Sequence, residues 1–190
     1  ITWTVMDING NPAVAVTQTV TVTDNQLPVI TTSGPLSANN TPGLCSAIVS
    51  VTAATAEDNC GVGSPVGTRS DGLALGDPYP VGVTTITWNV MDVNGNPAIA
   101  AIQTVTVTDN QAPVITTSGP INVNNTPGLC GANITVPPAT AQDNCTIGSP
   151  VGTRSDGLLL TDMYPIGVTT ITWNISDASG NAAITVPQIV

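Results

Sequence analysis

The chain has 190 residues and a formal net charge of −10, with two basic side chains and no histidine. So few positive charges exclude a nucleic-acid surface and argue against binding to an anionic membrane, because both need lysine or arginine to meet phosphates. No apolar run approaches the roughly 18 residues of a membrane span. The sequence also lacks a Gly-x-Ser-x-Gly turn and a phosphate loop, so we expect no enzyme.

An internal repeat organises the chain. Trp3, Trp88 and Trp173 are 85 residues apart, and residues 24–105 align with 109–190 without a gap, with 56 identities in 82 positions. This period is too long for a solenoid turn of roughly 20–50 residues and suits tandem small domains. We predict a truncated repeat at 1–23 that contributes its C-terminal hairpin, a complete repeat at 24–108 and a second repeat at 109–190. The chain is expected to be a window from a longer array.

Each repeat is predicted to be an all-β, immunoglobulin-like sandwich of about seven strands, with the repeats arranged end to end. Helix formers are scarce, while Thr, Val, Ile, Gly, Pro and Asn dominate. In chain order we expect strands at 29–32, 45–52, 61–70 (an edge strand), 84–91 and 99–107. Asn94-Gly95 supplies the left-handed turn of the last hairpin, and Gln103 is the one polar residue among its inward positions. The three tryptophans are predicted to be core residues.

The cysteines fall as two identical pairs, one in each repeat. Metal ligation is unfavoured because there is no histidine and no Cys-x-x-Cys spacing. We therefore predict the disulfides Cys45–Cys60 and Cys130–Cys145, with the chain between each pair running out and back. Disulfides place the protein outside the cytosol.

Arg69 and Arg154 lie in an eleven-residue run, residues 63–73, that recurs unchanged at 148–158. The simplest interpretation is a local ion pair with Asp71 and Asp156, worth at most about 1 kcal/mol if exposed. A contact between neighbouring rods is the alternative.

A run of motifs resembles the hyalin repeat (HYR) family. It comprises Asp58-Asn59-Cys60, then residues 79–88 (YPVGVTTITW), Asp92-x-x-Gly95-Asn96, and finally Val107-Thr108-Asp109 before Pro113-Val114-Ile115. The resemblance implies an immunoglobulin-like fold in secreted or cell-surface adhesins and no catalytic activity. Many hyalin repeats have two further cysteines near Thr32 and Ala100, both absent here. With the absence of lysine, this suggests a giant bacterial surface protein.

Asp92-Val93-Asn94-Gly95-Asn96 has oxygen-bearing side chains at alternate positions, as calcium loops do. The alternative is that these side chains only satisfy the backbone of a turn. In an immunoglobulin-like sandwich this hairpin lies where the chain enters, so calcium at a junction is a second hypothesis. Its ligands would come from Asp24, Asn25, Asp92, Asn94 and Asn96, and from Asp109, Asn110, Asp177, Ser179 and Asn181, with Asp58 and Asp143 as further candidates.

The first functional hypothesis is a stalk or spacer segment of a long extracellular, cell-surface adhesin, giving a stiff rod whose partners are the neighbouring repeats. Short linkers such as Asp24–Pro28, stiffened by proline, favour it. A second hypothesis is a module that binds a glycan or protein through its loops. A third is a filament whose chains associate side by side.

Overall fold

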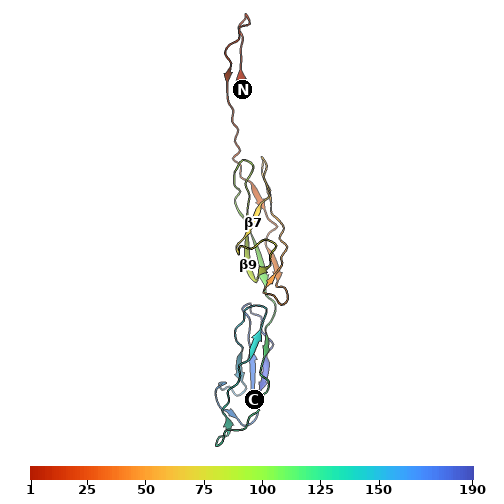
Figure 1. The fold of residues 1–190 in the computed structure, drawn as a ribbon, viewed down its shortest axis with the longest axis vertical. Coiled ribbons are helices and arrows are strands. Elements are labelled where there is room, and N and C mark those ends of the chain that lie inside the picture. Colours follow the sequence, from red (N-terminus) through yellow and green to blue (C-terminus); the bar gives the residue numbers. More distant parts are fainter. The chain divides into compact units, whose positions relative to one another are not determined.

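The computed structural model describes residues 1–190 and contains seventeen strands and no helix (Figure 1). No helix therefore offers a candidate membrane span. The chain divides into two compact units. Unit 1 comprises Ile1–Thr31, Ala54–Val66 and Trp88–Ala101, and unit 2 comprises Thr32–Ala53, Gly67–Thr87 and Ile102–Val190. The all-β prediction is confirmed.

Unit 1 holds two short antiparallel pairs. Strand β1 (Thr2–Trp3) pairs with β2 (Val16–Thr17), and β3 (Val29–Thr31) pairs with β6 (Thr55–Glu57). Residues 1–23 form only the first pair, and no second sheet covers it. Trp3 is therefore 59% exposed, and its prediction as a core residue is wrong for this structure.

Six further strands belong wholly or mainly to unit 2 and come from the repeat at 24–108: β4 (Leu36–Asn39), β5 (Ser46–Ala47), β7 (Val66–Arg69), β8 (Tyr79–Pro80), β9 (Gly82–Asn89) and β10 (Ala101–Thr108). They form a sheet in the order β4-β10-β9-β7 and the pair β5-β8. Strand β4 runs parallel to β10, with Leu36 opposite Val105, while β5 and β8 are antiparallel. The predicted edge strand is confirmed, since β7 ends its sheet.

The repeat at 109–190 lies entirely in unit 2 and has seven strands: β11 (Val114–Thr116), β12 (Gly131–Ala132), β13 (Thr140–Gln142), β14 (Val151–Arg154), β15 (Tyr164–Pro165), β16 (Thr170–Asn174) and β17 (Val186–Ile189). They pair as β14-β16-β17, β11-β13 and β12-β15. Its core gathers Ile115, Ala139, Tyr164, Ile171 and Trp173. This immunoglobulin-like sandwich packs large apolar side chains from all three sets of paired strands into one interior.

The alternation expected for the last two strands is confirmed. Ile86 and Trp88 of β9 are buried, as are Gln103, Val105 and Val107 of β10. The exception is Ile99, which is 81% exposed and precedes β10. The period-two pattern therefore predicted the inward face of each strand, including its polar member.

The predicted turn is present at Gly95, whose φ is 93°. Asn94 keeps a negative φ, because glycine alone in this chain adopts the left-handed region. The Asp92 carboxylate closes the turn by accepting hydrogen bonds from the backbone N–H groups of Asn94 (2.9 Å) and Asn96 (2.8 Å). The Asp92 side chain thus satisfies backbone groups of the turn, as the turn interpretation of the Asp-x-Asn-Gly-Asn run predicted.

Candidate functional site

The last hairpin of each repeat meets the linker that precedes the repeat. In unit 1 the Asn94 side chain donates to Asp24 Oδ2 at 3.0 Å, and the Asn96 side chain donates to the Asp24 carbonyl at 3.3 Å. In unit 2 the Asn181 side chain donates to the Asp109 carbonyl at 3.2 Å. The proximity predicted from topology is confirmed. These asparagine amides act as donors, so they hold the linker in place.

The hairpin aspartate is itself held by its turn. Asp177 accepts from the Asn181 N–H at 2.8 Å and from the Asn181 side chain at 2.7 Å. Desolvation, the largest single effect, raises the pKa of Asp177, but hydrogen bonds from Asn181, Ser179 and Gly180 together lower it below its usual value. Ser179 contributes through its backbone, and its side chain is exposed, as is Asn25.

Asp58 and Asp143 join these groups from the middle of each repeat. In unit 1, Asp24, Asp58 and Asp92 each bring a carboxylate oxygen within 4.8 Å of the others. In unit 2, Asp109 and Asp143 approach each other in the same way. Oxygen ligands of this kind suit a hard cation.

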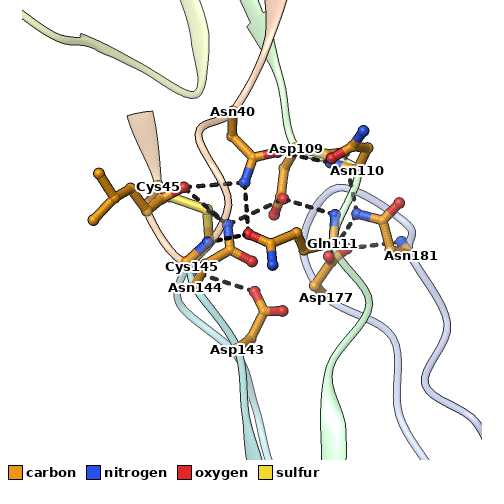
Figure 2. The surroundings of a disulfide bond; sticks show 12 residues. Asn40, Cys45, Asp109, Asn110, Gln111, Asp143, Asn144, Cys145, Asp177 and Asn181 are labelled. Carbon is orange, nitrogen blue, oxygen red and sulfur yellow. Dashed lines mark hydrogen bonds between the residues drawn. A yellow bond between two sulfur atoms is a disulfide. The ribbon is translucent and has the colours of Figure 1, made fainter. Parts of the chain in front are cut away.

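The disulfide in unit 2 joins Cys45 to Cys145, across a sequence separation of 100 (Figure 2). Cys60 and Cys130 are free thiols. The predicted pairs Cys45–Cys60 and Cys130–Cys145 are therefore wrong. The bond instead links a loop of the repeat at 24–108 to a loop of the repeat at 109–190.

The path of the chain explains this error. In the repeat at 109–190, β12 follows Cys130 and pairs with β15, whereas β13 precedes Cys145 and pairs with β11. The intervening segment thus runs one way along the sandwich and does not return. A stretch of about ten extended residues spans roughly 30 Å, far more than the roughly 4–7 Å between the Cα atoms of a disulfide.

Polar side chains surround the disulfide. Asn144 donates to the Leu44 carbonyl (3.2 Å) and to Asp109 Oδ1 (3.1 Å), which joins the two repeats beside the bond. Gln111 Oε1 accepts from the Asn40 side chain (3.1 Å) and from the Gly43 N–H (2.6 Å). No sequence motif marked Asn40, Gln111 or Asn144 as junction residues, although each has an identical counterpart 85 residues away.

A backbone contact completes this junction, and a free thiol lies beside the corresponding carboxylates of unit 1. The Asn110 N–H donates to Asn40 Oδ1 at 3.2 Å, so Asn110 supports the junction through its backbone. In unit 1, desolvation and the neighbouring carboxylates of Asp24, Asp58 and Asp92 raise the pKa of the Cys60 thiol above its usual value. This thiol therefore stays protonated at neutral pH.

The predicted Arg69–Asp71 and Arg154–Asp156 pairs are present, but both arginines are only 6% exposed. Arg154 donates through Nε to Asp156 (2.9 Å) and through its other nitrogens to Asp156 and to the carbonyls of Leu159, Asp162 and Met163. Its guanidinium also lies 3.8 Å from the centroid of the Tyr164 ring. Each arginine organises its own loop, which leaves no free guanidinium for a neighbouring rod.

The chain is similar in sequence to known proteins. Residues 23–107 match the model of the HYR domain. The chain is 34% identical over 178 residues to hyalin of Strongylocentrotus purpuratus, covering 89% of this chain and 14% of that protein. It is also 34% identical over 189 residues to hyalin of Lytechinus variegatus, covering 96% of this chain and 34% of that protein. Neither relative supports the expected bacterial source.

Among solved structures, the D00-D0 domain of intimin matches with 13% identity and a TM-score of 0.32, covering 86% of this chain and all of that one. A likeness this distant carries no argument here. The chain spans only a minor part of the two hyalins, so the activities of whole relatives do not transfer to it directly.

Proposed function

Because the chain belongs to the HYR domain family, we propose that it is a structural segment, a stalk or spacer, of a long extracellular cell-surface adhesin. The domains would be the repeats at 24–108 and 109–190, preceded by the last hairpin of another repeat at 1–23. The disulfide supports the extracellular location, since such bonds persist in oxidising compartments. The role is mechanical: the repeats set distance and resist bending.

The observation that carries the proposal is the Cys45–Cys145 bond. A peptide linker alone leaves two domains free to bend about it, and relative motion is the default where interfaces are small. Here a second covalent connection joins the repeats, and Asn144 and Gln111 add hydrogen bonds beside it. Two covalent connections between the same two bodies remove most of their bending freedom.

The binding-module alternative has less support. Protein surfaces that hold sugars commonly use exposed aromatic faces, but the four aromatic side chains of the two repeats at 24–190 are buried, and only Trp3 of the partial repeat is exposed. Both arginines are engaged in their own loops, so acidic ligands meet no free positive side chain. A spacer needs neither feature.

Small-angle X-ray scattering of the full chain tests the proposal. We expect the double variant C45S/C145S to show a broader distribution of interatomic distances and a lower apparent stiffness than the parent protein. The matched control C60S/C130S removes the two free thiols and should leave the scattering unchanged. If the disulfide variant scatters like the parent, the proposed stiffening is wrong. If chains associate laterally in electron micrographs, the filament alternative replaces the spacer.

A further inference from the structure

Three buried side-chain oxygens near the disulfide in unit 2 have no hydrogen-bond donor: Asp109 Oδ2, Asp143 Oδ1 and Asn144 Oδ1. Asp109 as a whole is only 3% exposed. Buried polar atoms are nearly always partnered, and an unpartnered carboxylate oxygen carries a large desolvation cost. Three such atoms in one place therefore require an explanation.

The other oxygens of the two carboxylates are already engaged, which fixes how the free ones point. Asp109 Oδ1 accepts from the Gln111 N–H and from the Asn144 side chain, both at 3.1 Å. Asp143 Oδ2 accepts from the Cys145 N–H at 2.9 Å. Figure 2 shows the Asn144 amide between the two carboxylates. The linker and the loop thus hold a carboxylate oxygen of Asp109 within 4.8 Å of one of Asp143.

No protein cation neutralises this pair of carboxylates. The one basic side chain of this repeat is Arg154, which is committed to Asp156 and to loop carbonyls. Two carboxylates at this distance repel each other unless a positive charge lies between or beside them. A bound metal ion would supply that charge and the absent partners at once.

A related carboxylate group occurs in unit 1. Asp24, Asp58 and Asp92 correspond to Asp109, Asp143 and Asp177 after a shift of 85 residues, and they form a three-carboxylate group. Asp58 Oδ1 is again buried and without a donor. A feature that appears in both units is a property of the repeat sequence.

We propose that each of these groups binds a divalent cation of the calcium class, with Asp109, Asp143 and the Asn144 carbonyl as ligands in unit 2 and Asp24, Asp58 and Asp92 in unit 1. Calcium takes 6–8 oxygen ligands in flexible geometry and readily completes its shell with water. Zinc is disfavoured because the chain has no histidine, and in unit 2 the Cys145 sulfur is committed to the disulfide, so the available ligands there are oxygens. The inference concerns binding and is independent of the proposed spacer role.

Isothermal titration calorimetry of the chelator-treated full chain with calcium chloride tests it, with magnesium chloride as the comparison. We expect two calcium sites per chain, one site in D143N and none in D58N/D143N, with at least tenfold weaker binding at each altered site. Asparagine keeps an oxygen that can accept from the Cys145 N–H, so these variants should fold. Intact folding is checked by circular dichroism and by the presence of the Cys45–Cys145 bond.

The matched control is E57Q, which removes an exposed charge next to Asp58 and places there the residue type that the second repeat has at Gln142. It should leave both sites unchanged. Thermal melting supplies a second measurement. In chelator, D143N should be at least as stable as the parent protein, because a buried unpartnered charge is gone. Added calcium should raise the melting temperature of the parent more than that of D143N. Absence of calcium binding by the parent protein, or equal binding by D58N/D143N, would overturn the proposal.

Discussion

The indole nitrogen of Trp173 donates a hydrogen bond of 2.9 Å to the side-chain oxygen of Gln188, inside the core of the repeat at 109–190. Gln188 in turn donates to Ser118 Oγ (2.9 Å) and to the Gly119 carbonyl (2.8 Å). One buried amide therefore connects β16 and β17 to the bend that follows β11. Residues 1–23 repeat the first contact at an exposed position, where Trp3 donates to Gln18 at 3.2 Å.

Replacing this amide should destabilise the repeat strongly. Q188M keeps the volume of the side chain but leaves the Trp173 N–H and the Gly119 carbonyl without their partner inside the core. Each buried group left unsatisfied costs about 1–3 kcal/mol, so we expect a loss of about 2–5 kcal/mol. Urea unfolding followed by tryptophan fluorescence measures it. The matched variant Q18M breaks the exposed copy of the contact and should change stability by less than about 0.5 kcal/mol. Equal effects of the two substitutions would contradict the argument.

Arg154 should tolerate no replacement, not even lysine. R154K retains the positive charge but loses the planar fork that reaches Asp156 and three carbonyls together. The guanidinium is fully buried whereas Asp156 is exposed, so the main cost is the set of loop carbonyls left without their donor, and we expect a loss of about 2–5 kcal/mol in a denaturant titration. The equivalent R69K tests the same loop in the other repeat. A loss below about 1 kcal/mol would mean that the loop holds itself without the guanidinium.

The sequence predicted local structure better than long-range pairing. Alternating Ile86, Trp88, Val105 and Val107 mark the buried faces because side-chain direction in a strand depends on sequence parity alone. The proximity of Asp24 to Asn94 was likewise predictable, because the last hairpin of an immunoglobulin-like sandwich lies at the end where the chain enters. The disulfide could not be predicted this way, because spacing says nothing about which end of a strand a cysteine occupies. The burial of the arginines was not predicted either, because their partners are backbone carbonyls, which every residue has and which leave no signature in the sequence.

The acid limit of stability should depend on Asp71 and Asp156. The hydrogen bonds from Arg69 and Arg154 are the largest cause that holds the pKa of each carboxyl below its usual value of 3.8. A lowered pKa in the folded state contributes stability that is present above the unfolded value and is lost as pH falls through the folded value. We therefore expect a flat unfolding midpoint from pH 7 to about 5 and a fall below about pH 4. The D71N/D156N variant should be less stable than the parent at pH 7, and its unfolding midpoint should fall less steeply as the pH decreases. The control E57Q should keep the parent profile, and parallel curves for parent and double variant would refute this account.

The alkaline limit should be set by the two tyrosines. Desolvation is the largest cause that raises the pKa of Tyr79 and Tyr164 above 10, against the opposing charges of Arg69 and Arg154. The neutral phenol is the protonated form, so its contribution is complete below pH 10 and is lost as pH rises through the folded value. Absorbance at 295 nm should therefore titrate above pH 10 in the native protein and near about pH 10 in urea. Because these are the only tyrosines in the chain, the signal reports nothing else. Coincident native and urea curves would contradict the burial of both rings.

The disulfide can be mapped with one protease, because trypsin can cut only after Arg69 and Arg154. After free thiols are alkylated in denaturant, a Cys45–Cys145 bond joins fragment 1–69 to fragment 70–154, whereas bonds within each repeat leave all three fragments separate. We expect the joined pair by mass spectrometry, with Cys60 and Cys130 alkylated. In the chain-entropy model a loop of about 100 residues contributes about 4.7 kcal/mol, so C45S/C145S should lose a large part of the stability of unit 2 and C60S/C130S almost none.

The same geometry predicts a partner for Cys130. Cys130 occupies the position of Cys45 one repeat later, and Val190 aligns with Val105, so a second copy of residues 106–190 attached after Val190 continues the repeat in register. Its own copy of Cys145 would then lie opposite Cys130, as Cys145 lies opposite Cys45. We expect Cys130 to become protected from alkylation in the extended chain and to appear in a new disulfide. Mutating the copied Cys145 to serine should restore alkylation of Cys130. If Cys130 remains alkylated in the extended chain, the bond between Cys45 and Cys145 is particular to one junction and not a rule of the repeat.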